Sequence, residues 1–237
     1  MGVIAGMLTR VESEDAYRSV QEALGRVLSQ PVSCLVTAAS RVAVESVACW
    51  DLPDDDRAAL LEWGLPRLPL FTPHPQVGAV PTLLPNRVGA YERHLVEDGL
   101  RLYEVGHWGP DANSSVVAVV PGEGRVLCLR PAPITVDDLP EVLRPYNQGL
   151  HKPAVSFFSS SVAQYVETAW RWHAALRILR RIEEPEFTVG EAELLRHYDR
   201  LHLLVERVVD AAARIDPAVE EAIQPSVWIE LIRENSV

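Results

Sequence analysis

Three consecutive serines, Ser159 to Ser161, are the residues of this chain that most suggest nucleophilic catalysis. A serine hydrolase usually carries its nucleophile in the pattern G-x-S-x-G, because the glycines let the hydroxyl project from a strained turn between a strand and a helix. Phe158 and Val162 flank the serines here, and no glycine is nearby. We therefore predict that one of the serines caps the helix that follows by accepting a backbone amide hydrogen bond. A small hydrolase that combines Ser159 or Ser161 with a distant histidine is the enzymatic alternative.

The histidines and glycines show no spacing that is typical of a metal or phosphate site. The seven histidines include no H-x-x-x-H or H-E-x-x-H pair, so no two imidazoles are expected on one face of a helix. Neither G-x-x-x-x-G-K-[ST] nor G-x-G-x-x-G, the glycine patterns that hold phosphate groups, occurs. We therefore expect no catalytic residue, no metal site and no cofactor. A metal site built from histidines that are distant in the sequence stays open.

The composition indicates an acidic globular protein whose surface suits a basic partner. The chain has 237 residues, which is enough for one large domain with a sizeable core. Its 33 acidic and 22 basic residues give a net charge of −11, which disfavours direct binding of nucleic acid and favours a basic protein partner. No apolar run approaches the roughly 20 residues that a membrane span needs. Three cysteines without C-x-x-C spacing suit a cytoplasmic location.

Helices are predicted where apolar residues recur at steps of three and four. In the helix that starts at residue 54, Asp54 or Asp55 is expected to cap the first amides, and Gly64 to end it. Thr188 and Glu191 have the spacing of a capping box at the start of a long helix. The predicted helices cover residues 12–29, 54–63, 162–179, 191–215 and 225–234.

Strands are predicted where β-branched residues cluster between turn-forming residues. The proline-rich segment 66–98 is expected to be a loop with short strand pieces near Phe71 and Leu83. The turn at 121–124 is short enough for a hairpin, so the central strands should form an antiparallel meander. The predicted strands lie within residues 34–39, 42–50, 99–106, 115–120, 124–131 and 154–158.

These elements predict an α+β fold in which a central antiparallel β-sheet is flanked by helices, with long helices at the C-terminal end. A single boundary is expected near residue 50. Residues 1–50 would then form an N-terminal extension that packs on the main domain, and residues 51–237 would form that domain.

The order of several short motifs adds a resemblance to this picture. "EWGLP" and "PLF" precede the strand "LRLYEVG", the hairpin "VVAVVPGEGRVLCLRP" and the strand-to-helix segment "AVSFFSSSVAQYVETAW". In this order they resemble the SUKH superfamily, and the fourth subfamily, that of immunity proteins, is the most similar. The resemblance covers residues 57–182 and, more weakly, residues 216–233.

The resemblance implies a compact SUKH-like domain that works by binding and is not an enzyme. It implies a partner as well, a cognate bacterial toxin domain, often a nuclease or a nucleic-acid deaminase, whose active site the immunity protein occludes. A scaffold or regulatory adaptor without a toxin is the second alternative. No direct contact with nucleic acid or membrane is expected, and the oligomeric state stays open.

The predicted partner-binding residues lie in two segments, an acidic run and a loop with an aromatic residue. The loop around Trp108 is the preferred contact site, although Trp108 packing under its own loop is an equal alternative. The acidic run that starts at residue 54 is either a solvated helix start or a surface that attracts a basic partner. The predicted partner-binding residues are Asp54, Asp55, Asp56, His107, Trp108 and Asp111.

Overall fold

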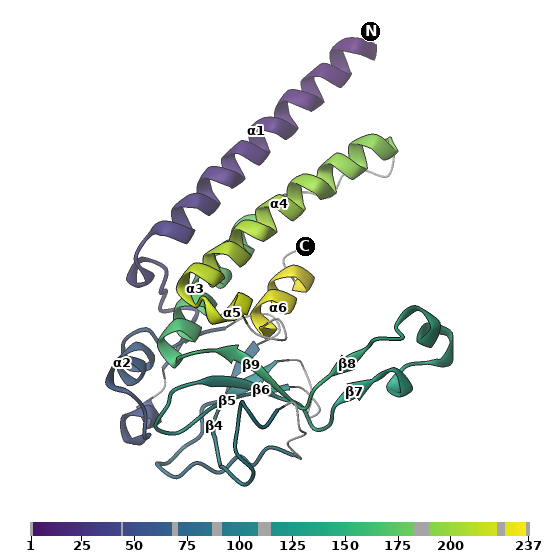
Figure 1. Cartoon of the computed structure of the whole chain (residues 1–237). Helices are drawn as coiled ribbons and strands as arrows, with labels where there is room; N and C mark the ends of the chain where they lie inside the picture. The colour runs from purple at the N-terminus through teal and green to yellow at the C-terminus, as the bar shows by residue number, and fades with distance from the viewer. Residues whose placement is uncertain are drawn as a thin grey trace.

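The protein is an α+β fold built on a five-stranded antiparallel sheet, as the sequence predicts (Figure 1). The strand order is β3-β4-β5-β6-β9, so the three central strands are a meander and β9 joins it at one edge. The computed structural model describes residues 2–43, 45–67, 71–86, 92–108, 115–182, 190–221 and 226–235. The strands are β3 (Phe71–Pro73), β4 (Tyr103–Trp108), β5 (Ser115–Val119), β6 (Val126–Leu129) and β9 (Val155–Ser159).

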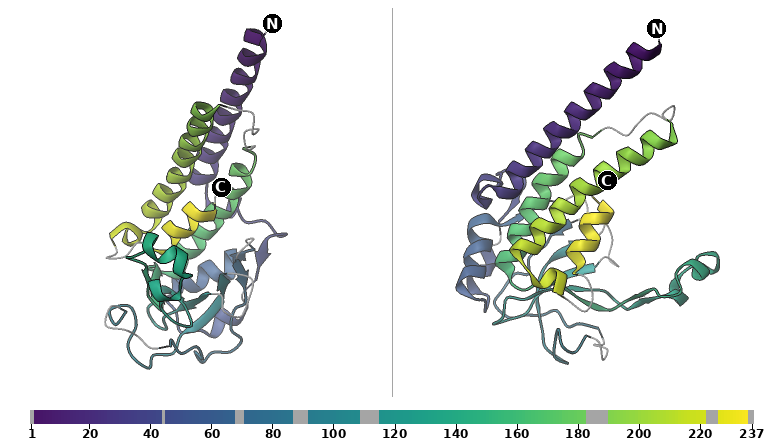
Figure 2. Two further views of the ribbon diagram at one scale, coloured as in Figure 1. Left: turned by 90° about the vertical axis from the view of Figure 1, so that its right-hand side faces the viewer. Right: turned by 45° about the horizontal axis from the view of Figure 1, so that its top comes forward.

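Helices cover one face of this sheet, and two of them extend beyond it. α1 and α4 run side by side along α3 and away from the sheet (Figure 2). The predicted helices are confirmed, and α1 begins well before the predicted start. The helices are α1 (Gly2–Ser29), α2 (Asp54–Trp63), α3 (Val162–Leu179), α4 (Glu191–Ile215), α5 (Ala218–Glu221) and α6 (Val227–Asn235).

Helix α3 is the central helix, because it contacts α1, α2, α4 and β9. Apolar residues at steps of three and four predict a stripe on this helix, and its side chains are buried: Val162, Tyr165, Ala169, Trp172, Leu176 and Leu179. Side chains outside the stripe, such as Val166 and Trp170, are buried as well. A helix that is apolar on most sides needs cover on most sides. Arg171 supplies part of that cover by donating hydrogen bonds to the carbonyls of Val27 and Leu28 at 3.2 and 2.9 Å, which holds the end of α1 against α3.

The two faces of the sheet bury different clusters. On β5, Val117 and Val119 pack with the helices in the large core. The alternate residues of the same strand region, Ala118 and Val120, belong to a smaller cluster on the opposite face of the sheet, which also contains Leu95. This alternation is what a strand with both faces covered requires.

The strands predicted within residues 34–39 and 42–50 are wrong. The described part of this region forms the 3-10 turns η1 (Val32–Cys34) and η2 (Glu45–Cys49). Of the predicted strand residues described there, only Val42 pairs, as part of the two-residue β1 (Arg41–Val42) with β2 (Leu65–Pro66). Trp50 anchors the region by stacking on Tyr103 with ring centroids 4.6 Å apart. β-branched residues report burial as much as strand geometry, which explains the error.

The described parts of the proline-rich segment match the prediction. β3 lies at the predicted position near Phe71, and Leu83 forms an isolated bridge with Leu102. The hairpin between β5 and β6 is also present, with φ angles of +74° at Gly122 and +75° at Gly124. These left-handed conformations need glycine.

The three serines make the joint between β9 and α3, and each has a different partner. Ser159 Oγ accepts a hydrogen bond from the indole of Trp228 at 3.0 Å. Ser160 donates its amide and its hydroxyl to the carboxylate of Asp216, at 2.6 and 2.8 Å. Ser161 is the N-cap of α3, since its hydroxyl accepts from the amide of Gln164 at 3.2 Å. The predicted capping role is confirmed.

Two other predicted caps have different outcomes. The N-cap of α2 is Pro53, and no side chain caps it, so the predicted cap by Asp54 or Asp55 is wrong. The predicted end of that helix is right, because Gly64 has a φ of +61° and its amide reaches the carbonyl of Leu60. For α4 the N-cap is Gly190, and Thr188 of the predicted capping box lies outside the described residues.

Replacing Asp216 should strongly destabilise the protein. The carboxylate is 1% exposed and accepts three hydrogen bonds, from Ser160 twice and from the amide of Ala218. Asp216→Ala leaves these donors buried and unpaired, so we expect a loss of about 3 kcal/mol in the free energy of unfolding. Urea unfolding followed by circular dichroism measures it. Asp210→Ala, an exposed aspartate on α4, is the control and should change stability by less than about 0.5 kcal/mol. Equal losses in both variants would contradict this assignment.

Candidate functional site

The first two acidic residues of α2 are exposed, as a partner-binding surface requires. Asp54 has a side chain that is 99% exposed and lies 3.5 Å from Arg57. Asp55 is exposed beside it in the first turn of the helix. Acidic groups in this position interact favourably with the helix dipole and remain accessible to a cationic partner.

Asp56, the third acidic residue, has an internal role. It is 2% exposed, and its Oδ1 accepts a hydrogen bond from the amide of Ala163 at 2.7 Å. It therefore caps α3 from a different helix. Its Oδ2 has no hydrogen-bond partner within the described part of the chain and faces Gly124, where an added Cβ would lie 1.7 Å from it. Burial raises the pKa of Asp56, and the amide hydrogen bond offsets only part of this effect. Its position does not present it to a partner.

Trp108 is buried in an aromatic cluster on the helix side of the sheet. Its exposed fraction is 7%, and its ring lies 5.1 Å from that of Phe71 and 5.5 Å from that of Trp172. Phe158 and Trp228 complete the cluster at 6.2 Å each. Trp108 is therefore not an exposed contact residue, and the rings that bury it come from β3, β9, α3 and α6 and not from its own loop.

His107 and Asp111 complete the predicted set. His107 is half-exposed, and its Nε2 lies 3.1 Å from the carboxylate of Glu104. Asp111 lies outside the described residues. α2 lies beside the β5–β6 turn, which is close to the start of β4. His107 lies near the other end of β4. The structure thus does not bring the acidic turn and His107 together in one site.

An exposed arm projects from the sheet. β7 (Ile134–Thr135) and β8 (His151–Lys152) pair and lead away from the sheet, and η3 (Val136–Asp138) and η4 (Glu141–Tyr146) lie between them (Figure 1). From residue 131 to residue 152 no side chain is buried. The right-hand view of Figure 2 also shows the arm extending away from the rest of the protein.

Hydrogen bonds within the arm give it a defined shape despite this exposure. Thr135 donates its amide and its hydroxyl to Asp138, at 2.7 and 3.0 Å, and these bonds hold the pKa of Asp138 below its usual range. Arg144 donates to the carbonyls of Leu139 and Asp137, both at 3.0 Å. At the base, Lys152 forms an ion pair with Glu230 of α6. The arm is therefore organised before any partner is bound.

Large apolar side chains face solvent at the tip of the arm. The exposed fractions are 75% for Val142, 45% for Leu143 and 85% for Tyr146, all in η4. Exposed apolar groups gathered on one element, rather than scattered, indicate an interaction surface. None of the helices and strands predicted from the sequence lies in this segment. The missed signal is the presence of three large apolar residues within a proline-rich loop.

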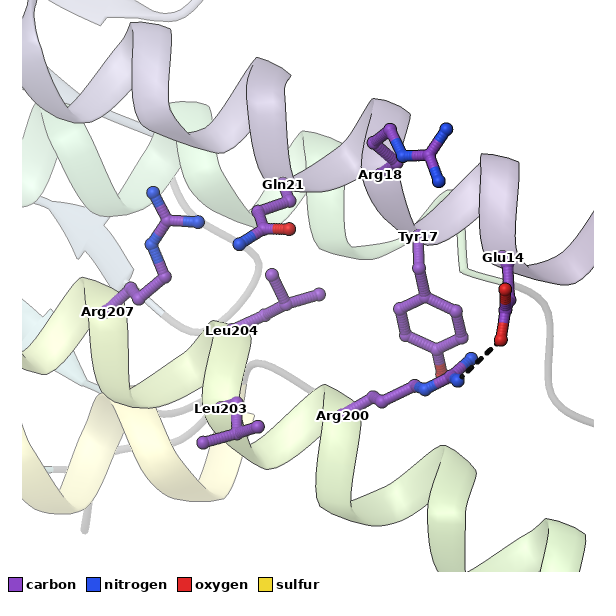
Figure 3. A pocket seen from close by; sticks show the side chains of 8 residues that line it. All are labelled: Glu14, Tyr17, Arg18, Gln21, Arg200, Leu203, Leu204 and Arg207. Carbon is purple, nitrogen blue, oxygen red and sulfur yellow. Dashed lines mark hydrogen bonds and ion pairs between the residues drawn. The ribbon is translucent and has the colours of Figure 1, made fainter.

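A groove of about 290 Å³ lies between α1 and α4 (Figure 3). Arg200 reaches across it, 3.2 Å from the carboxylate of Glu14 and 5.3 Å from the centre of the Tyr17 ring. The hydroxyl of Tyr17 lies 2.7 Å from Nδ1 of His197. These contacts join the two helices, so Tyr17 and Arg200 serve to hold α1 on α4.

The serine hydroxyls do not resemble a nucleophile site. A catalytic serine needs a neighbouring base to take its proton. The partners of the three hydroxyls are the Trp228 indole, the Asp216 carboxylate and the Gln164 amide, and each of these contacts supports the joint. The three hydroxyls therefore have structural roles at this joint.

The chain matches the model of the SUKH-4 immunity protein family over residues 21–234. The chain belongs to this family. The predicted family is thus confirmed, and membership supports an immunity-protein role for this SUKH-4 protein. The match begins within α1 and ends within α6, while the domain boundary near residue 50 stays a prediction. No match was found among curated proteins or among solved structures. Among the helices that the structure describes, none combines the length and apolarity of a membrane span.

Acidification should stabilise the wild type relative to Asp56→Asn. Because burial raises the pKa of Asp56 in the folded state, the folded protein binds this proton more tightly than the unfolded chain, whose Asp pKa is about 3.9. We compare the unfolding free energy of the wild type with that of Asp56→Asn at each pH. The wild type should gain stability over the variant as the pH falls through the pKa that Asp56 has in the folded protein, and the gain should level off below the pKa of the unfolded chain. Chemical denaturation between about pH 7 and about pH 4 measures it.

Asp55→Asn is the matched control, since Asp55 is exposed in the same turn. The relative stability of this variant should show no comparable rise on acidification. A difference for Asp56→Asn that is independent of pH, or that falls on acidification, would show that Asp56 is not held as a desolvated carboxylate.

Proposed function

We propose that this SUKH-4 protein neutralises a bacterial toxin by direct binding and occlusion of the toxin's active site. Membership of an immunity-protein family supports the role, and the projecting arm supports the mode of action. We further propose that the toxin acts on nucleic acid, as a nuclease or a deaminase. Enzymes of this kind carry basic surfaces that bind phosphate groups, and a chain with a net charge of −11 is complementary to such a surface.

The arm is the observation that carries the occlusion mechanism. Active sites are concave, so a partner that blocks one needs a convex element that enters it. The arm is convex, it is held by its own hydrogen bonds, and its tip presents Val142 and Tyr146 to solvent. A preorganised element loses little conformational entropy on binding, and tyrosine is a frequent binding hot spot.

The exposed acidic turn of α2 has a second, electrostatic role in this proposal. Asp54 and Asp55 do not belong to the arm, but they add to the negative field that attracts a basic toxin. Their contribution is to the rate of encounter and not to the final contact.

An adaptor without a toxin is the remaining alternative. It would use the same arm for a different protein, so the arm alone does not decide between the two functions. The gene neighbourhood does, because a toxin gene next to this one favours immunity and an isolated locus favours the adaptor. A cytoplasmic location stays a prediction within this proposal.

Truncation of the arm tip should weaken toxin binding. Tyr146→Ala and Val142→Ala each remove apolar surface that is exposed in the free protein, at 85% and 75%, so folding stability should not change. If these side chains fill a pocket of the toxin, each variant should raise the Kd for the toxin encoded next to this gene by about tenfold or more. Titration calorimetry with a catalytically inactive toxin domain measures it.

Val77→Ala is the control for the arm, because Val77 is 91% exposed on the segment that follows β3. It should bind the toxin as the wild type does. Normal binding by both arm variants would place the contact elsewhere and leave the immunity role standing. Absence of any complex between the wild type and the toxin would refute the immunity role itself.

Association with the toxin should be sensitive to salt. Raising the salt from about 20 mM to about 500 mM should lower the association rate constant by about tenfold or more and change dissociation little. Asp54→Asn combined with Asp55→Asn should lower the association rate constant at low salt by about twofold. Stopped-flow mixing gives both rate constants.

Glu193→Gln serves as the charge control, since Glu193 is an exposed acidic residue on α4. Its effect on association should be smaller than that of the two aspartates. An association rate constant that does not change with salt would show that the charge of the chain has no part in toxin capture.

A further inference from the structure

A β-bulge in β4 places two polar side chains on the same face of the sheet. Glu104 pairs with Ala118 and Gly106 with Val117, so Val105 is an extra residue in this strand. Residues three apart in a regular strand point to opposite faces, but the extra residue brings Glu104 and His107 to one face. This face is the one opposite the central helix α3.

The neighbouring strand adds a second histidine to this pair. β3 is the edge strand next to β4, and the chain continues along β4 beyond it, since the amide of His74 reaches the carbonyl of Val105 at 3.0 Å. Nδ1 of His74 lies 3.5 Å from Oε1 of Glu104, and Nε2 of His107 lies 3.1 Å from the same oxygen. Ligand atoms of all three side chains lie within 4.8 Å of one another.

The two distances to Glu104 match those between metal ligands. Zn²⁺ bonds to histidine nitrogen and carboxylate oxygen are about 2.0 to 2.1 Å long, so two ligands of a tetrahedral ion are about 3.3 Å apart. The two distances to Glu104 lie on either side of this value. Ligand atoms of the two imidazoles lie within 4.8 Å of each other, and a rotation of the His74 side chain, which is 74% exposed, would bring them to the separation that the ion needs.

The backbone at this point is built for close approach. A Cβ at residue 106 would lie 2.6 Å from the carbonyl of Thr72 and 2.9 Å from the ring of Phe71. Gly106 therefore lets β3 and β4 pair tightly beside the bulge. This pairing fixes the distance between β4, which carries Glu104 and His107, and the segment after β3 that carries His74.

We propose that His74, Glu104 and His107 bind a divalent transition-metal ion, of which Zn²⁺ is the first choice. Two imidazole nitrogens and one carboxylate oxygen suit Zn²⁺ and its first-row neighbours better than Ca²⁺ or Mg²⁺, which prefer oxygen ligands. Three protein ligands leave one position of a tetrahedral ion open. The site is at the edge of the sheet, and its half-exposed side chains leave that position accessible to water or to a side chain of a bound protein.

The test is a titration of the full chain, stripped of metal by a chelator and free of any affinity tag, with ZnCl₂. We expect one Zn²⁺ per chain with a micromolar or lower Kd. His74→Ala and His107→Ala should each raise the Kd by about tenfold or more. Titration with CoCl₂ should give the visible absorption of a four-coordinate ion, which the same variants should abolish.

His94→Ala is the matched control, since His94 is an exposed histidine outside the cluster. It should bind both ions as the wild type does. His74 is the decisive position, because its high exposure means that its replacement leaves the fold intact. Absence of Zn²⁺ binding to the wild type, or binding that His74→Ala leaves unchanged, would overturn the proposal and reduce the three residues to a hydrogen-bonded network.

Discussion

Two buried carboxylates, Asp56 and Asp216, accept the free backbone amides where β9 passes into α3, and the arrangement of the other elements follows from these bonds. The first amides of a helix lack partners within the helix and carry a partial positive charge, so a carboxylate is well suited to them. Asp56 comes from α2 and touches the β5–β6 hairpin at Gly124, and Asp216 comes from the end of α4. One junction therefore fixes two helices and a hairpin relative to the central helix.

This use of polar residues separates the inside of the protein from its working surfaces. The serines and the two buried aspartates form hydrogen bonds within the junction. Trp108, Trp172 and Trp228 belong to the core on the helix side of the sheet. The features that remain available to other molecules are peripheral: the arm, the first turn of α2 and the edge strand of the sheet. The binding function proposed for this SUKH-4 protein needs such a division, because its contacts must form without disturbing the core.

Local patterns predicted most of the fold, and tertiary contacts account for what they missed. The meander and the helices follow from alternation and from steps of three and four, which are properties of short segments. That Asp56 caps α3, and not its own helix, depends on a contact across 107 positions of the chain. The grouping of Glu104 with His107 depends on a bulge that the alternating pattern does not reveal. Burial of Trp108 depends on aromatic rings from four other elements.

The exposure of the arm has an evolutionary consequence. No side chain between residues 131 and 152 is buried, so substitutions in this segment leave the packing of the core unchanged. Selection for stability therefore constrains this segment weakly, apart from the residues whose hydrogen bonds keep its shape, such as Thr135 and Arg144. Substitutions at Val142 or Tyr146 can therefore change the binding specificity while the rest of the fold stays constant. This suits a protein whose proposed partners, bacterial toxins, change quickly in sequence.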